Sequence, residues 1–309
     1  MDGSSAGNSR TIQQSAADRE TRRVTWVSLA ANLVLSGLKF VGGLLGGSQA
    51  VVADAVHSLS DSTTDLAILV GIRYWSKPPD ATHPHGHRRV ETLVTTAIGM
   101  ALAVVAAGLL WNAISTLGEP HTTRPKWIAL VAALVSIASK ETLYRWTAAA
   151  GRRIRSMPLT ANAWHHRSDS LSSIPAALAV GGAMIHPAWS FLDHVGAVVV
   201  SLFIFQAAFK IIFPEMGKLL DSGASEETLR HIHSLALGVP GVRYVHRLRT
   251  RYCGSTCLAV DLHIKVDGNL TVDAGHDISE IVKRELLASD SDIVDVVVHL
   301  EPYKGERPS

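Results

Sequence analysis

Long apolar runs separated by short polar links dominate the first two thirds of the chain. Runs of roughly 20 residues are needed to cross a hydrocarbon core. Such runs predict membrane-spanning helices at about 24–46, 49–74, 92–116, 127–147, 159–186 and 193–213. Residues 1–23 are polar and have no apolar core segment, which predicts a disordered cytosolic tail rather than a signal peptide. The pattern therefore indicates an α-helical membrane protein with a six-transmembrane-helix bundle over 24–213.

The pattern changes after residue 213, where a mixed polar sequence begins. Helical periodicity over 226–237 and 272–288 and alternation over 242–251, 257–266 and 293–300 predict the order helix, strand, strand, helix, strand. This αββαβ order is typical of an α+β domain in which helices cover one face of a small sheet. We therefore expect residues 214–309 to form a separate cytosolic domain, whose modest core favours a dimer.

Composition also favours a membrane protein over a soluble globular one. The chain is 47% hydrophobic and only 18% charged, which is unusual for a soluble protein of this length. Its net charge of +2 is too small to predict nucleic-acid binding, and we expect none. Fifteen histidines against two cysteines indicate imidazole and carboxylate ligands, a set that suits zinc and similar ions.

Basic residues gather in the links on one side of the predicted bundle. They are Arg10, Arg19, Arg22 and Arg23 in the tail, Arg73, Lys77, Arg88 and Arg89 after the second span, and Arg145, Arg152, Arg153 and Arg155 after the fourth. The opposite links carry only Arg124 and Lys126. The positive-inside rule then places both termini in the cytosol. We expect a multi-pass protein in membrane lipid, most simply in a prokaryotic cytoplasmic (inner) membrane.

Ionisable residues recur on one face of the second predicted span. The spacing of Asp54, His57, Asp61 and Asp65 in steps of three or four places all of them on that face. Ionisable groups at bilayer depth cost several kcal/mol by most estimates, so a row of them indicates a polar interior, a water path or a bound cation. Asp54 and Asp65 could also act only by orienting or hydrating such a site.

The fifth span repeats this pattern with His165 and Asp169, which are again four residues apart. Two such pairs on two helices offer two imidazoles and two carboxylates, a tetrahedral set that zinc accepts. The alternative is that these polar residues serve helix packing or lie at the cytosolic flank.

Several motifs together resemble one known family. They are six spans, HSLSD in the second, WHHRSD in the fifth, GHRRVETL at the start of the third, and the αββαβ tail. In these features the chain resembles the cation diffusion facilitator family over nearly its whole length after the tail. The resemblance implies a homodimer with a ferredoxin-like cytosolic domain. It also implies an intramembrane transport site formed by His57, Asp61, His165 and Asp169. Some subgroups of the family have Asp as the first of these ligands, and His57 at this position resembles the zinc-preferring members.

The resemblance implies two further metal sites and one ion pair. A loop site maps onto Asp80, His83 and His87. A cytosolic site maps onto His246, His263, His276, His299 and Glu301, although Leu300 stands where some relatives have a polar ligand. Arg89 and Asp221 occupy the positions of a basic–acidic pair that joins the membrane and soluble parts. The roles of His85, Cys253 and Cys257 stay open.

The expected function is efflux of a divalent transition metal, with zinc as substrate and regulatory ligand, by exchange for protons. Ligands must be deprotonated to hold a metal, so metal and protons exclude one another at the site, and imidazole changes charge near neutral pH. Cobalt, cadmium, nickel, iron and manganese remain alternatives. A scaffold that senses metal without transport also remains open. An intramembrane metalloenzyme is disfavoured, because HExxH is absent and four protein ligands leave no position for water.

Overall fold

The computed structural model describes residues 3–118, 124–154, 157–254, 256–289 and 292–304, and the side chains of 3–22, 61, 64–70, 72 and 157–158 also lie outside the description. The chain divides into two compact units, one of residues 1–67 and 98–209 and the other of residues 68–97 and 210–309.

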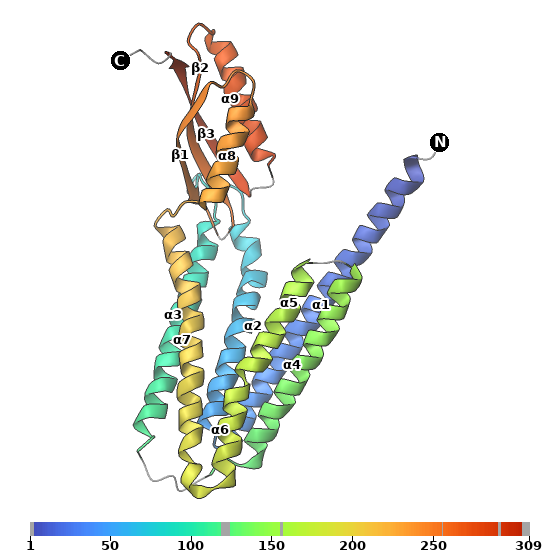
Figure 1. Cartoon of the computed structure of the whole chain (residues 1–309), viewed down its shortest axis with the longest axis vertical. Helices are drawn as coiled ribbons and strands as arrows, with labels where there is room; N and C mark the ends of the chain where they lie inside the picture. The colour runs from blue at the N-terminus through green and yellow to red at the C-terminus, as the bar shows by residue number, and fades with distance from the viewer. Residues whose placement is uncertain (1–2, 119–123, 155–156, 255, 290–291, 305–309) are drawn as a thin grey trace. The chain divides into compact units, whose positions relative to one another are not determined.

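The first unit is built from helices (Figure 1). In chain order the helical elements are α1 (Gly3–Gly46), α2 (Gln49–Trp75), α3 (Arg89–Ser115), α4 (Trp127–Ile154), α5 (Met157–Ser172), α6 (Ile174–Ile185), the short 3₁₀ helix η1 (Pro187–Trp189) and α7 (Phe191–Leu219). The last turns of α2 and α7 and the first turns of α3 belong to the second unit. Helix α1 begins within the segment 1–23 that we expected to be a disordered tail; its side chains before Arg23 are not described, and this domain boundary stays a prediction.

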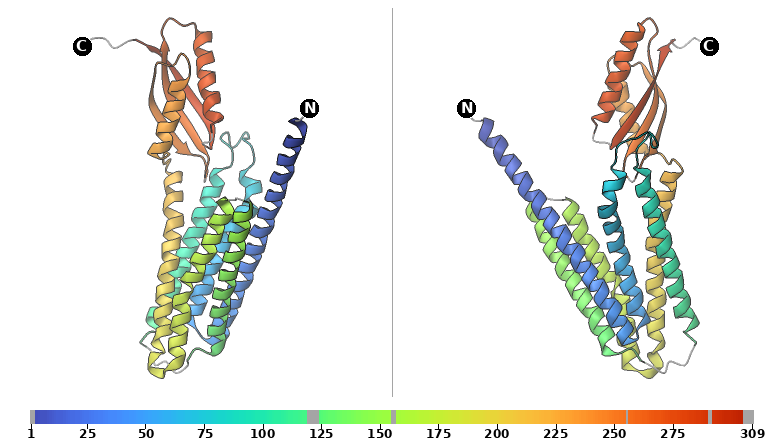
Figure 2. Two further views of the ribbon diagram at one scale, coloured as in Figure 1. Left: turned by 45° about the vertical axis from the view of Figure 1, so that its right-hand side comes forward. Right: turned by 180° about the vertical axis from the view of Figure 1, so that it is seen from behind.

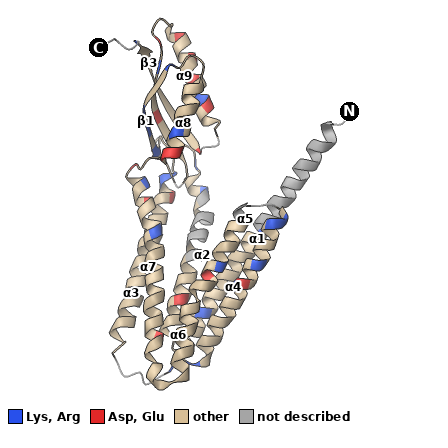
Figure 3. Cartoon of the chain, viewed as in Figure 1, with Lys and Arg blue, Asp and Glu red and all other residues tan. Residues whose placement is uncertain are grey.

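Four of the described helical segments are long and apolar enough to cross a membrane. They are Arg23–Gly46, Arg89–Ser115, Trp127–Ile154 and Pro187–Leu219. Figure 3 shows few charged residues along the apolar stretches of α3 and α7. Helices α2 and α5, which carry the predicted transport residues, are more polar. An α-helical transmembrane domain is thus confirmed, whereas the count of six crossings stays a prediction.

The fifth predicted span is broken in two. The sequence predicted one helix over 159–186, but α5 ends at Ser172 and α6 begins at Ile174. Pro175 lies in the first turn of α6, and because proline has no backbone N–H it cannot continue the hydrogen-bond ladder of α5.

Small residues bring α1 and α4 close together. The two helices lie side by side in the views of Figures 1 and 2. A Cβ placed on Gly42 would lie 2.5 Å from the Ala132 Cβ, and one on Gly46 would lie 2.6 Å from the Ala129 Cβ. Glycines four residues apart allow backbones to approach in this way, which favours van der Waals packing in a lipid environment.

The second unit contains the α+β domain that the sequence predicted. Its elements are α8 (Glu226–Gly238), β1 (Tyr244–Tyr252), β2 (Leu258–Asp267), α9 (Val272–Leu287) and β3 (Ile293–Tyr303). The sheet has the order β1-β2-β3, with β1 antiparallel and β3 parallel to β2. Both helices lie on one face of the sheet (Figures 1 and 2). Leu262 and Ile264 of β2 pack there against Ile232 of α8 and Leu286 of α9.

The opposite face of the sheet carries the residues between the core positions. Along β2 buried residues alternate with half-buried ones, so Asp261, His263 and Lys265 point away from the helices. Strand β1 has an irregularity between His246 and Arg249, where Arg247 adopts a φ of 49°. One extra residue in β1 at this point is a β-bulge, and it keeps His246 paired with His263.

Candidate metal sites

Asp169 is a buried carboxylate with a cation on one oxygen and an imidazole near the other. Its Oδ2 accepts a hydrogen bond from Lys140 Nζ of α4 at 3.1 Å. Its Oδ1 lies 3.7 Å from Nδ1 of His165, one turn earlier on α5. The Asp169 side chain is 7% exposed and that of Lys140 is 1% exposed, whereas His165 is about half exposed at 48%. The HxxxD spacing thus places His165 and Asp169 together, as expected on one helix face.

A second buried ion pair extends this network to α2. Lys39 Nζ of α1 donates to Asp54 Oδ2 at 2.9 Å, and both side chains are fully buried. The other oxygen of Asp54 accepts from the hydroxyl of Ser173 at 2.8 Å. Ser58, one turn after Asp54, accepts from Lys39 at 2.5 Å and from Lys140 at 3.1 Å. Two ammonium groups and two carboxylates therefore meet among α1, α2, α4 and α5, with Ser58 between the two lysines.

Two histidines near this network have ring nitrogens without a hydrogen bond. His57 on α2 has a buried Nδ1 with no partner, and His166 on α5 is 1% exposed with no partner on either nitrogen. A buried polar atom without a partner is costly and points to a missing ligand or water. The side chains of Asp61 and Asp65 lie outside the described residues, so the complete quartet of His57, Asp61, His165 and Asp169 stays a prediction.

The predicted loop site is assembled in the second unit. Asp80, His83 and His87 each offer a ligand atom, and these atoms lie within 4.8 Å of one another. His83 Nδ1 is 3.5 Å from Asp80 Oδ1, and His87 Nε2 is 3.4 Å from Asp80 Oδ2. His87 is buried and its Nδ1 has no partner, while the other two side chains are about half exposed.

The local turn fixes the carboxylate of Asp80 in its ionised form. Its Oδ1 accepts hydrogen bonds from the Thr82 hydroxyl at 2.8 Å, the Thr82 backbone N–H at 2.9 Å and the His83 backbone N–H at 2.7 Å. The Thr82 hydroxyl, followed by the His83 N–H, lowers the pKa of Asp80 to about 2. An Asp in such a turn satisfies nearby backbone donors, and here it also presents an anion to the two imidazoles.

The cytosolic histidines form one row across the sheet. His246 of β1 is paired with His263 of β2, and His263 is paired with His299 of β3. Glu301 lies two residues after His299 and thus on the same face. Its Oε1 is 2.8 Å from His263 Nδ1 and its Oε2 is 3.1 Å from His246 Nε2. The hydrogen bond from His263, with a smaller contribution from His246, lowers the pKa of Glu301.

The remaining two predicted members of this site differ in position. His299 Nε2 lies 3.8 Å from Glu301 Oε1, and its ring is 4.4 Å from that of His263. His276 is exposed on α9, the helix that covers the other face of the sheet. Within one chain the cluster therefore consists of His246, His263 and Glu301 with His299 beside them, and a role for His276 stays a prediction.

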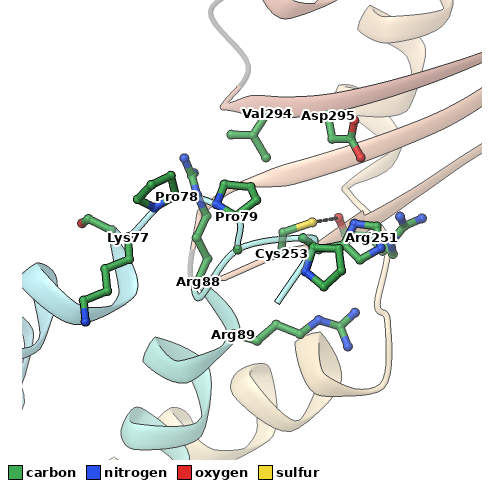
Figure 4. A pocket seen from close by; sticks show the side chains of 13 residues that line it. Lys77, Pro78, Pro79, Arg88, Arg89, Arg251, Cys253, Val294 and Asp295 are labelled. Atoms are coloured by element: carbon green, nitrogen blue, oxygen red, sulfur yellow. Dashed lines mark hydrogen bonds between the residues drawn. The ribbon is translucent and has the colours of Figure 1, made fainter. Parts of the chain in front are cut away.

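The loop site adjoins a pocket of about 750 Å³ between the loop and the β1–β2 hairpin (Figure 4). Its lining includes Lys77, Arg88, Arg251, Cys253 and Asp295. His85 also lines this pocket and is not part of the loop cluster. The Arg88 guanidinium donates to Cys257 Sγ. Burial raises the pKa of the Cys253 thiol, which disfavours the thiolate form that a soft metal would need.

The predicted pair of Arg89 and Asp221 forms in the same unit. Arg89 Nη2 donates to Asp221 Oδ1 at 2.6 Å, and the two side chains are 52% and 57% exposed. An ion pair this exposed contributes about 0–1 kcal/mol. It links the start of α3 to the segment after α7 and adds little to the stability of the fold.

The two buried lysines were not among the site residues predicted from the sequence. Lys39 and Lys140 each interrupt an apolar run, and an ionisable residue inside a membrane span is by itself a functional signal. The transport site was predicted from the spacing of histidines and aspartates alone, and this spacing occurs on α2 and α5. Ser58 and Ser173 gave no signal that could have been read from the sequence.

Two family models match this chain, one after the other. The cation efflux transmembrane domain matches residues 25–220, and the cytoplasmic domain of cation efflux proteins matches residues 224–303. Manganese efflux system protein MneP of Bacillus subtilis is 32% identical over 298 residues, which cover 94% of this chain and 100% of that protein. Metal tolerance protein C1 of Arabidopsis thaliana is 35% identical, with 92% of this chain and 63% of that protein covered.

Among solved structures, a MamM CTD variant in its cadmium form is 33% identical, covers 26% of this chain and 98% of its own, and has a TM-score of 0.25. The family assignment depends on the two matched family models and on the full-length relatives. These are transporters and not enzymes. This chain is therefore a multi-pass integral membrane protein of the cation diffusion facilitator family and a metal efflux transporter.

Proposed function

We propose that the chain exports a divalent transition metal, zinc in the first place, from the cytosol in exchange for protons. The ligands would be His57, Asp61, His165 and Asp169. The observation that carries this proposal is the buried carboxylate of Asp169, with His165 at one oxygen, in a polar network that also contains Asp54 and Ser58 of α2. A polar interior shared by α2 and α5 is what a midplane cation site requires.

The exchange follows from the chemistry of the ligands. An imidazole or a carboxylate can hold a metal only when it is deprotonated, so metal and protons compete for the same atoms. If the site opens alternately to each side, protons from outside would displace the metal outward and cytosolic metal would displace protons inward. Both termini would lie in the cytosol, by the positive-inside argument, in a prokaryotic cytoplasmic membrane.

The two sites in the second unit would assist this transport. The cluster of Asp80, His83 and His87 is suited to hold metal on the cytosolic side before it enters the bundle. The cluster of His246, His263 and Glu301 lies on the face of the sheet that the helices leave uncovered. Metal there would act as a regulatory ligand that tightens a homodimer and favours transport.

Manganese is a second candidate substrate, because a relative that matches this chain over its full length is a manganese efflux protein. Carboxylate-rich sites suit manganese, whereas two imidazoles suit zinc better. First-row divalent ions compete for the same ligands, so selectivity depends on geometry and ligand type and not on raw affinity alone. Uptake of the two ions by the reconstituted protein distinguishes these candidates.

The test is uptake by proteoliposomes under an imposed pH gradient, with zinc, manganese, cobalt, cadmium, nickel and iron compared. We expect Asp61→Ala and Asp169→Ala to abolish uptake of the preferred ion. Glu141→Ala is a matched control, because it removes a partly exposed acid from the neighbouring α4. Wild-type uptake in both site variants would refute the site. Metal binding without any uptake by the wild type would instead support a sensing scaffold.

A further inference from the structure

The ammonium group of Lys140 lies at one carboxylate oxygen of Asp169, the residue that we propose as a metal ligand. It donates to Asp169 Oδ2 at 3.1 Å, and both side chains are almost fully buried. The other oxygen, Oδ1, faces His165. A divalent ion bound by His165 and Asp169 would therefore lie near a fixed positive charge. At such distances two like charges repel strongly in a medium of low dielectric constant.

The contacts of Lys140 also give it a second partner. Its Nζ lies 3.1 Å from Ser58 Oγ as well as 3.1 Å from Asp169 Oδ2. A lysine ammonium has three donors on a flexible stem. It can thus release the carboxylate while it keeps the Ser58 hydroxyl. The other lysine, Lys39, is held differently, because its carboxylate partner is Asp54 and not a predicted ligand.

We propose that Lys140 is a tethered cation that competes with the transported metal for Asp169. This inference depends on the proposed function, since it assigns a role at the same site. In the empty transporter the ammonium neutralises the buried carboxylate, which would otherwise be an uncompensated charge. When metal binds, the ammonium leaves Oδ2 and remains on Ser58. When metal is released, the ammonium returns, so the site is never left as a bare anion that holds the ion too tightly.

A lysine that only joins α4 to α5 would have another effect. Loss of its charge would weaken folding and would leave metal affinity the same or lower. Loss of a competing cation should raise metal affinity and slow release. Loss of the Lys140 charge therefore raises metal affinity and lowers the transport rate only if Lys140 competes with the metal for Asp169.

The experiment measures zinc and manganese binding to the full-length protein in nanodiscs by calorimetry, and uptake in proteoliposomes. The relevant signal is the component of binding that Asp169→Asn removes, because the other two clusters would also contribute to the measured binding. For Lys140→Gln we expect that component to tighten about tenfold, which corresponds to the loss of one modest opposing interaction. We also expect kcat to fall together with KM. Lys140→Arg should stay within about threefold of the wild-type affinity.

Lys39→Gln is the matched control, because it removes the other buried ammonium of the network, whose hydrogen-bond partners are Asp54, Ser58 and Ser173 and not Asp169. We expect it to change the Asp169-dependent affinity by less than about threefold. Equal tightening in Lys39→Gln and Lys140→Gln would overturn the proposal, because the cause would then be the general positive potential. Unchanged or weaker binding by folded Lys140→Gln would overturn it as well.

Ser58→Ala supplies an independent test that does not depend on the folding of Lys140→Gln. Removal of the hydroxyl takes away the alternative partner of the ammonium, so the lysine should hold Asp169 more firmly and metal should bind more weakly. Unchanged or tighter binding in Ser58→Ala would overturn the proposal. The experiment distinguishes failure of the proposed transport site from failure of the competing role of Lys140. If Asp169→Asn leaves binding and uptake intact, the proposed transport site is wrong. If it removes one component of binding and abolishes uptake, but Lys140→Gln does not tighten that component, only the competing role of Lys140 is wrong.

Discussion

Asp193, near the start of α7, caps the N-terminus of α2 by accepting a hydrogen bond from the backbone N–H of Gln49 at 2.7 Å. Its other oxygen accepts from the Ser48 hydroxyl at 2.6 Å and from the Ala50 N–H at 3.4 Å. Ser48 Oγ in turn accepts from the Val51 N–H. The first N–H groups of a helix have no acceptor within it. Asp193 supplies acceptor oxygens from a distant part of the chain and so anchors the start of the helix that carries His57.

We expect Asp193→Ala to lower the free energy of unfolding by about 1–2 kcal/mol, the range for loss of a good helix cap. Asp193→Asn keeps an acceptor oxygen and should lose less. The measurement is thermal or denaturant unfolding of the detergent-solubilised protein. Equal stability of the alanine variant and the wild type would show that the cap contributes nothing to the fold.

The close approach of α1 and α4 gives a second prediction. A Cβ on Gly42 would lie 2.5 Å from the Ala132 Cβ, so Gly42→Leu must separate the helices at a cost of about 1–3 kcal/mol. Gly37 lies on the same helix with nothing within 4 Å of an added Cβ. Gly37→Leu therefore makes the same chemical change without the clash and should retain wild-type stability. A similar loss in both variants would mean that the α1–α4 contact is not its cause, because leucine is a better helix former than glycine and helix propensity alone would stabilise both variants.

The turn around Asp80 gives a prediction on pH. Its pKa is lowered to about 2, chiefly by the Thr82 hydroxyl. Because the folded value lies below the ordinary one, the stabilisation of the turn is present above the ordinary pKa and is lost as the pH falls toward about 2. We expect Thr82→Ala to raise the pKa of Asp80, and Thr82→Ser, which keeps the hydroxyl, to leave it low. Carbon-13 NMR of a labelled sample measures this directly, and equal titration of the two variants would contradict the assignment.

The half-buried thiol of Cys253 should react slowly with maleimides. Burial raises its pKa, and only the thiolate is a good nucleophile. In a Cys257→Ser background, labelling of Cys253 should therefore need a higher pH than labelling of an exposed thiol. Thr256→Cys in a chain without Cys253 and Cys257 supplies the exposed reference on the same turn. Identical pH profiles at the two positions would show that the pocket does not suppress the thiolate.

Much of the fold could be predicted from periodicity alone. The predicted strand over 257–266 corresponds to β2, Leu258–Asp267, and the predicted helix over 226–237 corresponds to α8, Glu226–Gly238. The break between α5 and α6 was not predicted, because 159–186 has the length of one span and its polar stretch up to Ser173 was assigned to the transport site. Pro175 marks that break, but proline also occurs inside helices, as Pro214 does in α7, so its effect could not be read from its presence.

The candidate sites were predictable only in part. Spacing gives the face of a helix on which a residue lies, and this was enough to place His165 with Asp169. It does not say which faces of different helices meet, and so the pairing of Lys140 with Asp169 and of Lys39 with Asp54 could not be predicted. The histidine row is a comparable case, because it depends on the register of three strands and on the bulge near Arg247.

That register leads to the last prediction. His263 lies in the middle of the row, with His246 and His299 on either side and Glu301 within 2.8 Å of its Nδ1. Removal of the central imidazole leaves the outer ligands without a shared neighbour. We therefore expect His263→Ala to weaken metal binding at this cluster at least about tenfold. Calorimetry on the full-length protein in an Asp80→Ala, Asp169→Ala background isolates this cluster from the other two.

His276→Ala is the matched control, because His276 is exposed on the helix that covers the opposite face. If one chain supplies all the ligands, this variant should bind metal as the background protein does. A loss as large as that of His263→Ala would mean that α9 reaches the metal from elsewhere, and the only other source of α9 is a second copy of the chain. The comparison therefore distinguishes a cluster that is complete within one subunit from one that metal completes across a dimer, and only the second couples metal binding directly to association.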